Sequence, residues 1–355
     1  MIYVGAKNNT ATQIADVIGK DKSRQEIIQY YSQVIKNYST KDSDSVKPAD
    51  TKTRKRLHSF DNNEESVNII IANKLFVSND TSFLPEFEEI MKNEYGAAEP
   101  EKLNFGDKKA SAKEINNFVC EATKGVIKQI ITPEDINSDM VAAIINAVYF
   151  QGFWEEPFQN RRKRKFHSNP VRKIDMMTTS PKDGDWNYRA GKEWTALGIP
   201  YKSRKTWMFI VLPEKKNGLS DLLEKMDVEL FKDVTTWQKS GKLGVTIPVI
   251  KTTTQLELPA CLKKLGITDA FNNTCDLTNM FVGCRQYEIG KAIHKAVITV
   301  DETGTVAAAA TASFPQARCA PGFFDADHPF LYFITTSESA ESITPKDILF
   351  VGTFC

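Results

Sequence analysis

Features that mark metal proteins, disulfide scaffolds and membrane proteins are scarce in this sequence. Its 355 residues include only six cysteines and four histidines. Six cysteines are too few for a disulfide framework in a chain of this length, so we expect free thiols, with a Cys275–Cys284 bond as the alternative. No apolar run reaches the roughly 18 residues that a membrane-spanning helix needs. The formal net charge of +1 gives no overall attraction to nucleic acid or to a membrane surface.

Catalytic and cofactor-binding signatures are missing as well. His58, His167 and His328 have no cysteine or carboxylate at the spacing of metal ligands, so we predict no metal site. The sequence contains no Gly-x-Ser-x-Gly elbow, no phosphate-binding loop and no dinucleotide fingerprint, so we expect neither an enzyme nor a cofactor. A signal-peptide pattern is absent too. Sequons nevertheless weakly favour an extracellular location over a cytoplasmic one, at Asn8, Asn37, Asn79 and Asn272.

Apolar spacing predicts a mixed α+β fold, with helices early and strands late. Helical spacing occurs over residues 23–38, where Ser23 is a suitable cap, and over residues 111–131. The polar stretch 40–65 is expected to be a long surface loop inserted before a strand. Strand-like segments occupy residues 67–77, 141–150, 207–212, 245–250 and 294–300, followed by two segments that resemble a hairpin, 331–335 and 348–354.

The most informative segment runs from Val300 to Ser313 and reads VDETGTVAAAATAS. Ala-rich runs favour helices, so an Ala-rich helix or linker is one interpretation. As a strand, the segment would place only small side chains on one face, because side chains alternate across a strand: Thr305, Ala307, Ala309, Thr311 and Ser313. Such side chains can enter a core that is already close-packed. The composition suits a segment that is a loop in one state and a buried strand in another.

This segment resembles the hinge of a serpin, the family of suicide protease inhibitors. The matching hinge residues are Glu302, Gly304, Thr305, Val306, Ala307, Ala308, Ala309 and Ala310. The resemblance places the reactive-centre loop at residues 302–327 and the scissile bond between Arg318 and Cys319. His328-Pro329-Phe330 resembles the strand after the loop. An arginine before the scissile bond implies a trypsin-like target, because such proteases hold a carboxylate in their primary pocket.

Two more blocks carry the resemblance, which covers essentially the whole chain. Asn146 matches the shutter asparagine and Trp154 the breach tryptophan, while His294 matches a shutter histidine that the resemblance implies to be a latch between strands. The implied structure is an α+β serpin fold in one domain, residues 1–355, with three β-sheets, roughly eight to nine helices and an exposed reactive-centre loop. The family's first helix and one central strand have no counterpart, because Met1–Gly5 matches the end of its second helix.

The resemblance implies a monomer that inhibits a trypsin-like serine protease. The protease would form an acyl-enzyme at Arg318, and the freed loop would insert into the main sheet as a new strand. Two alternatives remain open. One is a non-inhibitory serpin with a binding or carrier function, and the other is an inhibitor of a papain-like cysteine protease.

Two runs of basic residues stand apart from these blocks. Runs of charge usually form a solvated surface, and the functional alternative is binding to a polyanion such as a sulfated glycosaminoglycan. The second run also resembles a nuclear-localisation signal. The candidate residues are Lys52, Arg54, Lys55 and Arg56 in the first run and Arg161, Arg162, Lys163, Arg164 and Lys165 in the second.

Overall fold

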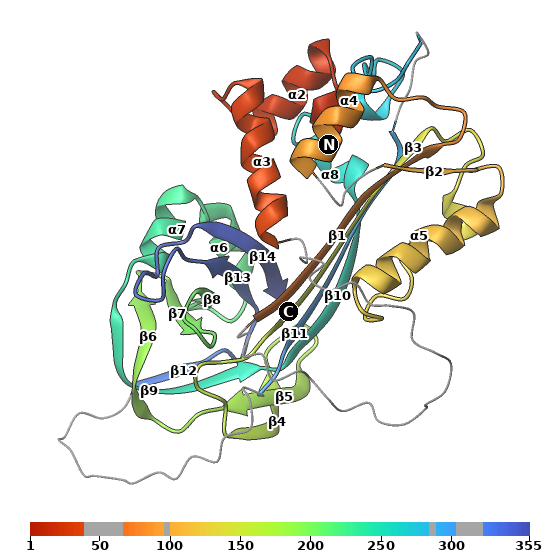
Figure 1. Ribbon diagram of the computed structural model, residues 1–355. Helices are drawn as coiled ribbons and strands as arrows, with labels where there is room; N and C mark the ends of the chain where they lie inside the picture. Colours follow the sequence, from red (N-terminus) through yellow and green to blue (C-terminus); the bar gives the residue numbers. More distant parts are fainter. Residues whose placement is uncertain (39–66, 96–99, 284–288, 303–321) are drawn as a thin grey trace, which may run out of the picture. The chain divides into compact units, whose positions relative to one another are not determined.

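The computed structural model describes residues 1–38, 67–95, 100–283, 289–302 and 322–355 (Figure 1). These residues form two compact units. Of the described residues, the first unit contains those up to Tyr38, within Ile69–Phe150 and within Thr252–Val297. The second contains Val67 and Asn68 and those within Gln151–Lys251 and Ile298–Cys355. The loop expected at 40–65 lies outside the described residues. None of the described helices is long and apolar enough to cross a membrane.

A five-stranded sheet belongs mainly to the first unit. Its strands are β1 (Val67–Ser78), β2 (Glu101–Leu103), β3 (Ala142–Gly152), β10 (Ile250–Glu257) and β11 (Ile289–Val300). They follow the order β10-β11-β3-β1-β2, so β11 hydrogen-bonds to β10 on one side and to β3 on the other. The strands expected at 67–77, 141–150 and 294–300 are confirmed as β1, β3 and β11.

Both faces of the central strand β3 contribute to the core. On β3, Ala143 and Ile145 pack in one core cluster with Ile115 of helix α5 (Lys108–Ala122), which Figure 1 shows alongside the strands. Ala142, the residue just before Ala143, points to the opposite face because side chains alternate along a strand, and it belongs to a second core cluster. Burial on both faces explains why β3 is a nearly continuous apolar run.

The other helices of the first unit contribute to that second cluster. They are α1 (Ile2–Gly5), α2 (Asn8–Ile18), α3 (Arg24–Tyr38), α4 (Pro85–Ile90), which continues as a π-helix to Tyr95, and α8 (Leu258–Lys264). Helix α3 begins where the sequence predicts. Ser23 Oγ accepts a hydrogen bond from Glu26 N at 3.3 Å, and Glu26 Oε2 accepts one from Ser23 N at 2.8 Å. The two bonds form a capping box.

The helix expected over 111–131 is wrong at its C-terminal end, because α5 stops at Ala122. Lys124 and Gly125 both have positive φ, 50° and 80°. Gly125 N donates to Cys120 O at 2.7 Å and Lys124 N donates to Glu121 O at 3.0 Å, which is the hydrogen-bond pattern of a Schellman motif. Val126 continues the apolar spacing beyond this point, so periodicity alone did not reveal the end of the helix.

The second unit is built on a nine-stranded sheet. It contains β4 (Asn160–Phe166), β5 (Arg172–Thr178), β6 (Lys182–Ala190), β7 (Trp194–Pro200), β8 (Thr206–Pro213), β9 (Lys239–Pro248), β12 (Gly322–Asp325), β13 (Phe330–Thr336) and β14 (Asp347–Phe354). The order is β14-β13-β8-β7-β6-β9-β5-β4, with β12 on β9. The resemblance implied three separate β-sheets. Here strand β9 pairs with β6 and also with β5, so these strands belong to one continuous sheet.

The strand predictions for this unit are mostly confirmed. The segment 207–212 lies within β8, and the C-terminal hairpin is the antiparallel pair β13 and β14. The single strand expected at 245–250 is wrong. Val249 separates β9 from β10, and these two strands belong to different sheets.

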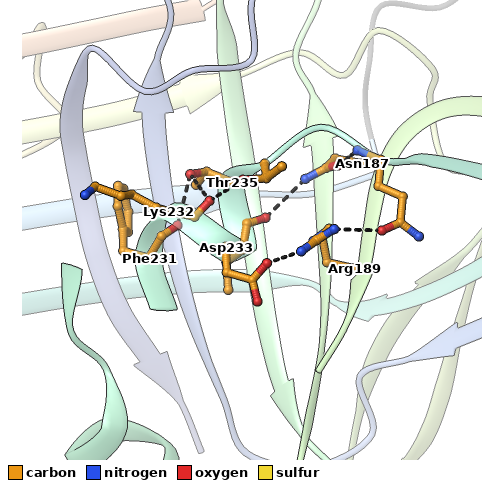
Figure 2. Close-up of polar contacts among 9 residues, drawn as sticks. Asn187, Arg189, Phe231, Lys232, Asp233 and Thr235 are labelled. Carbon is orange, nitrogen blue, oxygen red and sulfur yellow. Dashed lines mark hydrogen bonds and ion pairs between the residues drawn. The ribbon is translucent and has the colours of Figure 1, made fainter. Parts of the chain in front are cut away.

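Helices α6 (Leu219–Lys225) and α7 (Val228–Thr235) pack on this sheet, and a buried amide joins α7 to β6 (Figure 2). Asn187 is 1% exposed. Its Oδ1 accepts from Gln238 N at 2.6 Å, and its Nδ2 donates to Val234 O at 3.1 Å. At the margin of the same network, the guanidinium of Arg189 donates to Asp233 and to Gln238 Oε1. The amide therefore pairs with two backbone groups, one of them in a buried hydrogen bond and the other in a partly buried one.

We predict that Asn187→Ala destabilises the protein by on the order of 2–3 kcal/mol, because it leaves the buried Val234 O and the partly buried Gln238 N without their partner. Arg189→Gln is the matched control from the same strand and should cost less than about 1 kcal/mol, because it removes only a partly exposed ion pair. Denaturant midpoints of the two variants measure the difference. Equal losses would show that the buried amide has no special role.

Candidate functional site

Three polar side chains from neighbouring strands meet on one face of the five-stranded sheet. Asn146 of β3 lies between Asn73 of β1 and His294 of β11. Its Nδ2 donates to Asn73 Oδ1, and its Oδ1 forms a hydrogen bond with His294 Nδ1. Leu75 is two residues from Asn73, and Ala292 is two residues from His294. Side chains two residues apart lie on the same face of a strand, and both residues belong to the second core cluster, so the trio lies on the face that this cluster covers.

The trio forms a directional chain of hydrogen bonds. An amide oxygen only accepts, so His294 Nδ1 carries a proton and donates it to Asn146 Oδ1. Burial lowers the pKa of His294, which keeps the ring neutral near pH 7 with its single proton on Nδ1. The chain then runs from β11 through β3 to β1. It links β3 to β11 near the middle of both strands.

Trp154, two residues after β3, is held by an aromatic cluster of the second unit. Its ring stacks on Tyr201 with centroids 4.4 Å apart, and Phe158 approaches at 5.8 Å in an edge-to-face arrangement. Trp154 is only 2% exposed. Its Nε1 donates to the backbone oxygen of Asp301 at 2.8 Å. Because Asp301 follows β11 directly, this buried indole fixes the position at which the chain leaves the strand.

Glu302, the first of the expected hinge residues, is held by Arg161 of β4. Arg161 Nη1 lies 3.4 Å from Glu302 Oε1, and Arg161 Nη2 lies 2.8 Å from Asp175 Oδ2 on β5. The carboxylates of Asp175 and Glu302 raise the pKa of Arg161 by hydrogen bonding to it. One guanidinium thus connects the end of β11 to the β4–β5 pair.

The chain on the other side of residues 303–321 is also attached to the second unit. Strand β12 pairs in parallel with β9, from Gly322 opposite Leu243 to Asp325 opposite Thr246. Asp325 Oδ2 accepts from Arg164 Nη2 of β4 at 2.7 Å. β12 therefore lies inside the range 302–327 expected to be a loop. The strand expected at His328-Pro329-Phe330 begins at Phe330 as β13.

The basic run Arg161–Lys165 lies on β4, an end strand of the nine-stranded sheet, with all five side chains exposed. Arg161 and Lys163 both pair with Asp175, and Arg164 pairs with Asp325. Arg162 and Lys165 have no ion-pair partner within the part of the chain that the structure describes. The other basic run lies outside the described residues, with Lys52, Arg54, Lys55 and Arg56.

The structure brings some of the expected site residues together and separates others. Asn146 and His294 are in contact, whereas Trp154 belongs to a separate cluster in the second unit. The rest of the hinge and the scissile bond lie outside the described residues: Gly304, Thr305, Val306, Ala307, Ala308, Ala309, Ala310, Arg318 and Cys319. Cys120, Cys261 and Cys355 carry free thiols, and the alternative Cys275–Cys284 bond involves Cys284, which is also outside.

Two residues of these clusters were missed by the sequence interpretation. Asn73 completes the polar trio, and its signal is an amide next to Lys74 in a run from Ile69 to Val77 that is apolar at its other positions. Tyr201 forms the stacking surface for Trp154, but it follows Pro200 in a region without a recognisable pattern. Only the contact between the two rings identifies its role.

Acidification tests the neutral state of His294. Its pKa is lowered by burial, so below the ordinary value of 6.5 the unfolded chain binds a proton that the folded chain does not. Stability should therefore fall as the pH drops through about 6.5, and no such contribution should remain above that pH. His294→Gln keeps an N–H donor but no titratable group, so we predict a smaller drop in denaturant midpoint between pH 7.5 and 5.5.

His167→Gln is the control for this measurement, because it removes a histidine from another part of the protein. It should keep the acid sensitivity of the wild type. If His294→Gln were as acid-sensitive as the wild type, burial of His294 would not be the source of the pH dependence.

The indole of Trp154 is predicted to contribute through two separable interactions. Trp154→Phe keeps an aromatic ring on Tyr201 but removes the donor to Asp301 O, and should cost about 0.5–1.5 kcal/mol. Trp154→Ala also loses the stacking and should cost about 3–5 kcal/mol.

Trp237→Phe is the control, since Trp237 is 44% exposed and its change should stay within about 0.5 kcal/mol. Denaturant unfolding distinguishes the three. A Trp154→Phe protein as stable as the wild type would contradict the anchoring role of Nε1.

Comparison with known proteins identifies relatives along the whole chain. The sequence model of one family, serpin (serine protease inhibitor), matches residues 1–355. Serpin B3 of Homo sapiens is 30% identical over 372 residues, which cover 100% of this chain and 89% of that protein. Serpin B6 of Macaca fascicularis is 31% identical over 370 residues with the same coverage of both chains. These relatives give no support to the expected secretion.

Solved structures share the fold. Arabidopsis AtSerpin1, in its native stressed conformation, matches with a TM-score of 0.81 at 24% identity and covers 99% of this chain and 87% of its own. Serpin48 of the insect Tenebrio molitor, described as a highly specific serpin, matches with a TM-score of 0.77 at 26% identity and covers 99% and 86%. The expected α+β serpin fold is confirmed, and this chain belongs to the serpin family.

Proposed function

We propose that this serpin is a suicide inhibitor of trypsin-like serine proteases. The catalytic serine of the protease attacks the carbonyl carbon of Arg318, and the Arg318–Cys319 peptide bond breaks. The serine oxygen becomes the ester oxygen of an acyl-enzyme, and the proton passes through the protease's histidine to the new amino group of Cys319. The segment 303–317 then inserts beside β11 as a strand before water can hydrolyse the ester.

The observation that carries this proposal is the seam between β3 and β11. These strands are hydrogen-bonded neighbours, and the contact between Asn146 and His294 crosses from one to the other. The small residues beginning at Thr305 follow β11 after only a few residues, so a reversal of the chain at Glu302–Gly304 would lay them along β11. A strand entering this seam would replace one polar contact and the row of backbone hydrogen bonds between β3 and β11, and it would form two rows in their place, a net gain of one row.

The family description, serine protease inhibitor, supports the general activity, and Arg318 supports the class of target. An arginine side chain fits a pocket with a buried carboxylate. We also propose that the chain acts as one domain, as a monomer and without enzymatic activity of its own. The alternatives are inhibition of a papain-like cysteine protease and a non-inhibitory role in which the segment is only a cleavable surface.

Incubation with trypsin, followed by denaturing electrophoresis and mass spectrometry, tests the proposal. We predict a covalent complex of protease and serpin together with a released peptide that begins at Cys319. Arg318→Ala should abolish both products, because it removes the charge that trypsin selects. Cleavage after Arg318 without a complex would favour the non-inhibitory alternative. A complex with papain but not with trypsin would favour the cysteine-protease alternative.

Insertion is tested by a matched pair of arginine substitutions on adjacent positions. Thr305→Arg would bury a charge on the inward face of the inserted strand, so this variant should be cleaved as a substrate without forming the complex. Val306→Arg lies on the opposite face, because side chains alternate, and should retain most of the inhibition. Undiminished inhibition by Thr305→Arg would contradict insertion.

A further inference from the structure

The second unit contains a hollow where β7 begins, β8 ends and helices α6 and α7 pack on the sheet. Its volume is about 240 Å³, and Trp194, Pro213, Leu222 and Leu230 form its apolar lining. A cavity of roughly 150 Å³ can hold benzene. This hollow therefore has room for one aromatic ring with a short side chain.

The walls of the hollow are held in place by the protein itself. Glu214 N donates to Glu193 O at 2.8 Å, which joins the end of β8 to the start of β7. The indole of Trp194 lies against Gly191, so closely that a Cβ at position 191 would collide with the ring. The hollow is thus formed before any ligand enters, as is usual for small-molecule sites.

Three lysines surround a single carboxylate at the rim of the hollow. Lys225 of α6 forms an ion pair with Glu193. The hydrogen bond from Lys225 lowers the pKa of Glu193, and the charges of Lys215 and Lys192 lower it further. Within the described part of the chain, Lys192 and Lys215 form no ion pair of their own. Two positive charges therefore lie beside the apolar lining without a carboxylate in direct contact.

We propose that this hollow binds a small aromatic anion, a ligand with one ring and a carboxylate on a short chain. The ring packs on Trp194, because aromatic rings stack favourably on an indole. The carboxylate is held by Lys192 and Lys215 through charge-assisted hydrogen bonds. Glu214 and Asp221 also line the rim and oppose an anion, so their removal should strengthen binding. The inference does not rest on the proposed inhibition, because neither the reactive bond nor the five-stranded sheet takes part in it.

Nuclear magnetic resonance of the intact, isotope-labelled protein tests the site through the indole N–H signal of Trp194. Trp194→Phe assigns this signal by its loss, and the signal of Trp237, which does not line the hollow, is the control. Hydrocinnamate, a phenyl ring on a two-carbon chain that ends in a carboxylate, should shift the Trp194 signal with a dissociation constant of about 1–10 mM. The Trp237 signal should stay in place. An unmoved Trp194 signal, or equal shifts of both signals, would overturn the site.

Two analogues of the ligand separate its charge from its aromatic ring. Hydrocinnamide has the same shape without the charge and should bind about twofold to fivefold more weakly, the range expected for exposed charge pairs. Cyclohexanepropionate keeps the charge but has no π face, and should bind about twofold to tenfold more weakly. Equal binding of the amide would mean that only apolar surface is recognised and would overturn the anion. Equal binding of the cyclohexyl compound would overturn the choice of an aromatic ligand.

Matched substitutions in one exposed turn test the contribution of charge. Lys215→Gln should weaken hydrocinnamate binding about twofold to fivefold, and Glu214→Gln should strengthen it by a similar factor. Lys216→Gln is the control and should leave the affinity nearly unchanged, because Lys216 pairs with Asp327 at 3.7 Å and does not line the hollow. Binding of the neutral amide should be the same in all three variants. If Lys215→Gln and Lys216→Gln weakened hydrocinnamate equally, a general effect of charge would replace the proposed site.

Discussion

Asn146 lies in the middle of β3, and the side chains next to it on the same face of that strand are apolar. Its amide hydrogen-bonds to the strand on either side, and these contacts fix the arrangement of β1, β3 and β11. An amide in such a face costs on the order of 1–3 kcal/mol when it lacks partners. Asn73 and His294 supply one partner from each adjacent strand, and they do so only when β1, β3 and β11 keep this register. The side-chain contact between β3 and β11 is thus a polar one. A strand that enters between them can replace a hydrogen bond with its own, whereas it would have to separate packed apolar side chains.

The chain that leaves β11 is held by contacts of two different strengths. The indole of Trp154 is buried and stacked, and its bond to Asp301 O is shielded from salt. The pair between Arg161 and Glu302 is partly exposed and worth at most about 1 kcal/mol. The contact at Asp301 O is therefore less sensitive to salt than the ion pair of the next residue, Glu302. If Glu302 begins the proposed hinge, the backbone just before it is held by the stronger of the two contacts.

Local signals in the sequence were sufficient for part of this structure. Ser23 predicted the start of α3, and the apolar run through Val148 predicted β3. The end of α5 was not predictable from spacing, because the left-handed residues Lys124 and Gly125 interrupt a pattern that continues beyond them. The family motif located Asn146, Trp154 and His294, but their partners are set by tertiary contacts between distant segments. Asn73 was recognisable as a polar residue in a strand, and nothing in the sequence indicated which residue it would meet.

The basic run on β4 shows why charge alone is an incomplete guide to a binding surface. Five adjacent cations suggest a site for a polyanion, yet Arg161, Lys163 and Arg164 are already paired with carboxylates that lie elsewhere in the sequence. A polyanion that uses these cations must displace Asp175, Glu302 or Asp325, so its net affinity is lower than the charge count suggests. The groups that it would displace are not equivalent, because Glu302 and Asp325 lie on either side of residues 303–321 whereas Asp175 belongs to the neighbouring strand.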